Sequence, residues 1–135
     1  LRRRFLTLLD EQSRLERMAR IIGKDAMPAR QQVTLLCAEL VNEAFLRQSA
    51  FAPKDRHASP AKQAAMMRVT GRFVDLAEEA LARGVAPARV AALDCLRPLA
   101  RMGEDTGEDE LERLEALARD VDAQFHALVP DEAPA

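Results

Sequence analysis

The stretch PARQQVTLLCAELVNEAFLRQSAF, from Pro28 to Phe51, decides the expected fold. Most of it has the three- and four-residue apolar spacing that gathers side chains on one face of an α-helix. The residues on that face are Val33, Leu36, Cys37, Leu40, Ala44 and Phe45. The pattern stops at Gln48, and Phe51 follows beyond the expected helix end, two residues before Pro53. A core helix needs no aromatic ring past its last turn, so Phe51 is a candidate for a role outside the core.

Helices are also expected on both sides of this stretch. The first runs from Leu1 to Ile22, and Gly23 is expected to end it with a left-handed backbone. Ser59 followed by Pro60 is typical of a helix start, and the helix there should continue to about Arg83. The apolar side expected for the first helix comprises Leu1, Phe5, Leu8, Leu15, Met18, Ala19 and Ile22.

The last third of the chain is expected to be less regular until its final helix. Pro98 should break or kink the segment around it, the acidic run 103–107 should be a loop, and Thr106 should cap the last helix. That helix carries a stripe at strict three- and four-residue spacing, formed by Leu111, Leu114, Ala118, Val121, Phe125 and Leu128. Such a stripe belongs either on the bundle or against a partner helix.

The whole pattern predicts an all-α fold, an antiparallel helical bundle of about five to six helices. Residues 1–129 are expected to form a single helical domain, cut from a longer chain, and residues 130–135 a flexible tail. The composition, with 48% hydrophobic and 31% charged residues, is that of a globular domain. No apolar run approaches the length of a membrane span.

The charge balance and the reactive residues exclude several classes of function. The 20 Lys and Arg nearly cancel the 22 Asp and Glu, which disfavours a protein that wraps phosphate backbones. Cys37 and Cys95 lie in apolar periodic segments and are interpreted as buried thiols in a reducing compartment. No glycine-rich phosphate loop, metal-ligand spacing or nucleophile–base arrangement occurs, and His57 and His126 have no partner cluster. We therefore assign no catalytic residue and no metal ligand.

Several short motifs together resemble a known family. Residues 15–28 (LERMARIIGKDAMP) and 45–51 (FLRQSAF) are similar to the C-terminal helical domain of the catalytic A subunit of archaeal and vacuolar-type rotary ATPases. The similarity continues through Pro53, Asp55, Ser59-Pro60, Lys62, Glu79-Ala80 and Gly84-Val85, and it covers about residues 14–102. Each motif is weak alone, but their order and spacing are specific. The resemblance implies a helical cap whose ATP-binding domain lies upstream.

The resemblance also implies two sites. Phe51 corresponds to the aromatic residue that packs on the adenine ring, with Gln48 and Ala50 beside it. The turn between the first two helices corresponds to the lever tip that pushes on the rotor, and it comprises Lys24, Asp25, Ala26, Met27, Pro28, Ala29 and Arg30. The family usually carries acidic residues after this proline, whereas Ala29, Arg30 and Gln31 follow here.

The same resemblance sets the expected cofactors and partners. The intact subunit would use ATP or ADP with magnesium, and the fragment alone should bind no cofactor and hydrolyse no ATP. Partners would be the central-stalk rotor subunits and the non-catalytic B subunit, with no nucleic acid. The complex would sit on the cytoplasmic face of a membrane, and the isolated fragment would be a monomer or weak dimer.

Two other functions remain open at this point. A free-standing helical adaptor could bind a partner helix through the final stripe, and a DNA-binding regulator is a more distant third. The reading frame before Leu1 discriminates the first two, because a GxxxxGK[ST] segment upstream is typical of an ATPase, whereas a nearby start codon favours the adaptor. Salt-dependent binding to duplex DNA would revive the third.

Overall fold

The computed structural model describes residues 1–47, 59–107 and 109–128, and every element in these ranges is helical. The elements are α1 (Arg2–Ile22), the 3₁₀ turn η1 (Lys24–Ala26), α2 (Ala29–Val41), the π-helical η2 (Asn42–Arg47), α4 (Pro60–Ala82), α5 (Pro87–Ala91), α6 (Leu96–Asp105) and α7 (Leu111–Leu128). The predicted all-α bundle is confirmed. The candidate adenine residues Gln48, Ala50 and Phe51 lie outside the described residues.

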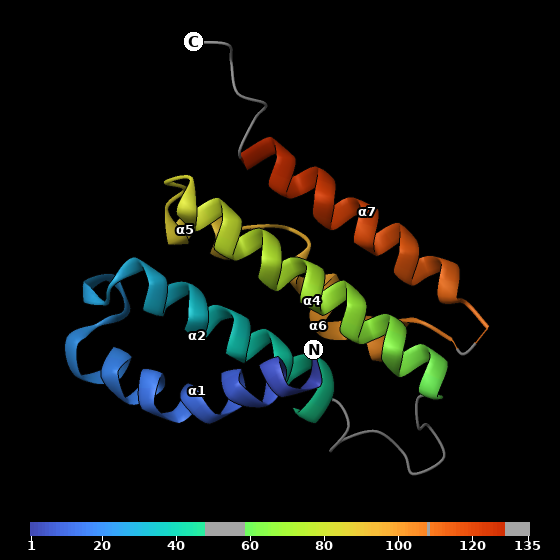
Figure 1. Cartoon of the computed structure of the whole chain (residues 1–135), viewed down its shortest axis with the longest axis horizontal. Helices are drawn as coiled ribbons and strands as arrows, with labels where there is room; N and C mark the ends of the chain where they lie inside the picture. Colours follow the sequence, from blue (N-terminus) through green and yellow to red (C-terminus); the bar gives the residue numbers. More distant parts are fainter. Residues whose placement is uncertain (48–58, 108, 129–135) are drawn as a thin grey trace.

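The helices form a hairpin set against a second group of helices (Figure 1). α1 and α2 run antiparallel, joined by the turn at η1, and α4 runs back along α2. α5 and α6 then return the chain, so that α7 runs parallel to α4. Figure 1 shows the η1 turn and the η2 segment at opposite ends of the hairpin. α2 with η2 is therefore one continuous helical rod between these two ends.

The core has one large cluster and one small one. In the large cluster α4 meets α7 through Phe73 and Phe125, whose ring centroids lie 5.2 Å apart at an interplanar angle of 66°. The small cluster consists of Leu15, Met27 and Leu35 and lies within the hairpin. Leu35 lies off the face that the apolar spacing of α2 predicts, because α2 buries side chains toward both clusters.

The start of α4 is tied to the end of α6. Ser59 caps α4 as predicted, accepting a hydrogen bond from the backbone N–H of Lys62 at 3.1 Å. The buried Lys62 ammonium donates to the carbonyl oxygens of Gly103 (2.9 Å) and Thr106 (2.5 Å). The last carbonyls of a helix lack intrahelical partners, so this ammonium both neutralises and fixes the end of α6. Lys62 thereby anchors the start of α4 to the end of α6.

Three predictions about the region around α6 are wrong. Pro98 is the third residue of a continuous helix, where its missing N–H removes no intrahelical bond, so it neither breaks nor kinks α6. Gly103 lies within α6 against Met66 rather than in a loop. Thr106 ends α6 and is buried, whereas the side chain of Glu110 accepts the Gly107 N–H before α7 begins.

The stripe of α7 packs on the bundle. Leu114, Val121 and Phe125 are buried, and the other three members of the stripe are partly buried against the large cluster. Of the two alternatives left open by the spacing, the structure therefore selects the core. The adaptor hypothesis loses the surface on which it depended.

Both cysteines are buried and free, as predicted. Burial raises the pKa of Cys37 from 9.0 to about 12 and that of Cys95 to about 11. Because only the thiolate reacts, we expect neither thiol to react with an aromatic disulfide at pH 8 in the folded chain, and both to react in denaturant. Reaction of the folded chain at the unfolded rate would contradict this burial.

The same pKa values predict an alkaline loss of stability. The folded state keeps two protons that the unfolded state releases above pH 9, so these groups lower the free energy of unfolding as pH rises from about 9 to 12. Urea unfolding at increasing pH, compared with a Cys37→Val variant, measures the contribution of Cys37.

Candidate functional site

The turn between α1 and α2 is short and internally hydrogen-bonded. Gly23 adopts φ 89°, a backbone region that favours glycine, and its N–H donates to the Ala19 carbonyl at 2.9 Å. The N–H groups of Ala26 and Met27 donate to Gly23 and Lys24 at 3.1 and 3.2 Å. Pro28 precedes α2 as its N-cap. These hydrogen bonds restrain the backbone of the turn.

Met27 anchors this turn inside the domain. Its side chain is 3% exposed and fills the small cluster between Leu15 of α1 and Leu35 of α2. The side-chain amide of Gln32 donates to the Met27 carbonyl at 2.9 Å. Apolar contact and hydrogen bond together hold the turn against both helices.

The other residues of the predicted rotor contact face solvent. They are Lys24, Asp25, Ala26, Pro28, Ala29 and Arg30. Ile21 and Ile22 adjoin them and are 76% and 49% exposed. The prediction that Ile22 faces the core is wrong, and the isoleucine pair was missed as a surface feature. Adjacent helical residues point about 100° apart, so a doublet of isoleucines in the last turn was the available signal.

A charged pair lies beside the turn. Lys24 Nζ is 3.9 Å from Glu39 Oε1 of α2, and both side chains are partly exposed. Burial raises the pKa of Glu39 above its ordinary value; Lys24 opposes this rise and Glu16 adds to it. The Lys24–Glu39 attraction therefore only partly offsets the desolvation cost of burying the Glu39 carboxylate between α1 and α2.

At the opposite end, α2 continues as the π-helical η2. The ring of Phe45 packs on Phe5 of α1, with centroids 5.7 Å apart. The side-chain amide of Asn42 donates to Gln12 Oε1 at 3.2 Å. Leu46 is exposed, and the chain then enters the segment that carries the candidate adenine residues. π-Helical turns are rare in proteins, and those that occur often lie at functional sites.

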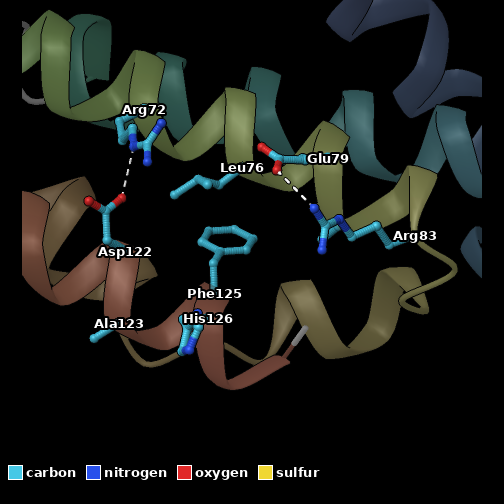
Figure 2. Close-up of a pocket in the computed structure, with 9 residues that line it drawn as sticks. Arg72, Leu76, Glu79, Arg83, Asp122, Ala123, Phe125 and His126 are labelled. Atoms are coloured by element: carbon cyan, nitrogen blue, oxygen red, sulfur yellow. Dashed lines mark hydrogen bonds and ion pairs between the residues drawn. The ribbon is translucent and has the colours of Figure 1, made fainter. Parts of the chain in front are cut away.

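A groove of about 540 Å³ lies between α4 and α7 (Figure 2). Figure 2 shows Phe125 pointing toward Leu76 across it. Its charged rim is paired within the chain, Arg72 with Asp122 at 2.8 Å and Arg83 with Glu79 at 3.8 Å. It contains no residue of either predicted site.

Within the described ranges, no three or more His, Cys, Asp or Glu side chains are grouped so that they could hold a metal ion. No helix in the same ranges has the length and apolar character needed to span a membrane.

Comparison with known proteins identifies the family. Residues 1–90, which include the hairpin and α4, match the family described as the C-terminal domain of V and A type ATP synthase. The chain belongs to this family.

The ATP synthase C-terminal domain also has curated relatives along nearly its whole length. It is 36% identical to the A subunit of the A-type ATP synthase of Thermococcus onnurineus over 95% of this chain, and 31% identical to that of Methanopyrus kandleri over 97%. The corresponding protein of Natronomonas pharaonis is 37% identical over 90%. The domain spans 21%, 22% and 20% of these relatives, about a fifth of their length. The predicted family is confirmed, and α6 and α7 lie beyond the family match but within the matches to relatives.

Proposed function

We propose that this domain completes the catalytic A subunit of a V/A-type ATP synthase and connects its nucleotide site to the rotor. The observation that carries the proposal is the rod formed by α2 and η2. One end of the rod is an exposed turn with its own hydrogen bonds, and the other end precedes residues 48–51 in the chain. Relatives named as the A subunit of A-type ATP synthases support this assignment.

On the nucleotide side, Phe51 would pack on the adenine ring, flanked by Gln48 and Ala50. This contact supplies affinity without chemistry, since ATP or ADP and magnesium would be held by the phosphate-binding part of the subunit. The whole subunit would hydrolyse or synthesise ATP, whereas the domain alone would be inactive. Its own contribution is to shape the adenine side of the site.

On the rotor side, the exposed turn from Lys24 to Arg30 would contact the central stalk. Ile21 and Ile22 add apolar surface to this contact, and Met27 fixes it to the rod. Exposed isoleucines beside an ordered turn are a sensible contact for an apolar stripe on another helix. The B subunit would be the other neighbour, in a complex peripheral to the cytoplasmic face of the membrane.

The test for the nucleotide role is Phe51→Ala in the intact subunit. Stacking on a base is worth about 1–3 kcal/mol, so the KM for ATP should rise between about fivefold and a hundredfold, with a smaller change in kcat. Phe51→Tyr keeps the ring face and should restore most of the affinity. Leu6→Ala, at an exposed position of α1 outside both proposed sites, is the control. An unchanged KM would reduce Phe51 to an anchor on its own domain.

A further inference from the structure

The π-helical register of η2 needs something to hold it. A π-helix has i→i+5 hydrogen bonds and is much rarer than the α-helix, which is the default continuation of α2. Its relaxation to an α-helix would change the rotation of everything beyond it, at about 100° and 1.5 Å per residue. The register of η2 (Asn42–Arg47) therefore sets the direction in which the chain leaves the rod.

η2 contacts α1 through a ring pair and a polar bond, and it also packs against α6. Phe45 packs on Phe5, which is an adaptable contact because the ring can slide on its neighbour. The hydrogen bond from Asn42 Nδ2 to Gln12 Oε1 is directional and acts on the first residue of the π-helical turn. Gln12 is thus placed to define where the α-helix ends and the π-helix begins.

The polar contacts continue from Gln12 along α1. Its Nε2 donates to Glu16 Oε2 at 3.1 Å, one turn farther along α1 toward the η1 turn. Burial is the main cause of the raised pKa of Glu39, and the charge of Glu16 adds to this rise. Glu39 in turn pairs with Lys24 in η1 at 3.9 Å.

These five residues, Lys24, Glu39, Glu16, Gln12 and Asn42, form what we call the seam chain. All of them except Lys24 are partly buried between α1 and α2. Partly buried polar contacts are stronger and more directional than solvated ones, because less water competes for them. The seam chain therefore runs along the hairpin from the exposed turn to the first residue of η2.

We propose that Gln12 is a positioning residue that holds η2 in the π-helical register through Asn42, and that the seam chain makes this register sensitive to the state of Lys24. The consequence for nucleotide binding rests on the proposed function above. In that setting, a partner that draws Lys24 away from Glu39 would alter the placement of the residues after Arg47. The two ends of the rod would then be linked by named side chains and not by stiffness alone.

The first test uses NMR on the 135-residue chain. Gln12→Leu keeps the side-chain volume but removes the acceptor of Asn42. We expect the Cα shifts of residues 42–46 to move toward α-helical values and amide exchange there to rise about fivefold, the effect of one lost hydrogen bond. Ser13→Ala, at an exposed neighbouring position, should leave both unchanged. Unchanged shifts and exchange in Gln12→Leu would overturn the proposal.

The second test addresses the part of the seam chain between Gln12 and Lys24. Lys24→Met should change amide exchange at residues 42–46 in the wild-type background but not in Gln12→Glu, which still accepts from Asn42 and cannot donate to Glu16. Non-additivity in this double-mutant cycle measures the coupling. Equal effects of Lys24→Met in both backgrounds, or none in either, would overturn the coupling. Lys24 is exposed and Gln12 is partly exposed, which favours folded variants.

The third test separates this proposal from the proposed function. In the intact subunit, Gln12→Leu should raise the KM for ATP several-fold, whereas Ser13→Ala should not. A changed register in the isolated chain with an unchanged KM would support positioning by Gln12 and contradict the adenine role of the segment after Arg47. An unchanged register with a raised KM would contradict the positioning and leave the adenine role standing.

Discussion

Replacing Phe73 by alanine should lower the free energy of unfolding by about 3–5 kcal/mol, the cost typical of removing a buried ring. Phe73 is fully buried, and its ring meets Phe125 edge-on, so it joins α4 to α7 at the centre of the large cluster. α4 and α7 make one of the two most extensive helix pairings, and the cavity would lie between them. Urea unfolding followed by circular dichroism gives the value directly.

Two companion variants make this measurement specific. Phe73→Leu retains most of the buried volume and should cost less than half as much. Leu6→Ala removes an exposed leucine of α1 and should change stability by less than about 0.5 kcal/mol. Similar losses for Leu6→Ala and Phe73→Ala would mean that α4 and α7 do not form the stabilising centre of the fold.

Replacing Met27 by alanine should loosen the hairpin end and leave the rest of the bundle ordered. Met27 is 3% exposed and belongs to a cluster separate from the main core, so its loss of about 2–4 kcal/mol should appear as local opening. Hydrogen exchange should accelerate at residues 21–32 and stay unchanged in α4 and α7. Ile21→Ala, which removes exposed apolar surface, is the matched control and should not accelerate exchange.

The same variant separates the two proposed roles of the domain. In the intact enzyme, a loosened turn would transmit less force, so ATP hydrolysis should continue while rotor-coupled ion transport declines. The η1 turn, which Met27 follows in the chain, lies at the opposite end of the rod from η2, so the KM for ATP should change little. Equal loss of hydrolysis and transport would show that Met27 acts through folding of the whole subunit, not through the turn.

The hairpin and the restart at α4 were predictable because their signals are local. Gly23, Ser59 and Pro60 act through their own backbone and their nearest neighbours, and the structure places all three at helix boundaries. The family was also recognisable, since motif order survives where single residues vary. The turn between α1 and α2 was therefore predictable from the sequence, whereas its contact with the rotor and the adenine contact of Phe51 both remain predictions.

The errors have a different origin. Local rules predict a break or kink at Pro98 and a helix cap at Thr106, but packing of α6 against α4 carries the helix through that region. Ile22 continues the apolar pattern of α1. It lies beyond the part of α1 that the small cluster covers, so its side chain is exposed. Lys62, a charged residue by sequence, is buried because it satisfies carbonyls that only tertiary contact brings within reach.

The sequence by itself determined the helical class, the main boundaries and the family, because apolar periodicity and capping act over a few residues. Only the tertiary structure decided which side of each helix is covered. It buried the α7 stripe in the bundle, turned Ile21 and Ile22 outward, and aligned Gln12 of α1 with Asn42 of η2. Pairing between residues 30 positions apart depends on how two helices cross, and no local pattern encodes that crossing.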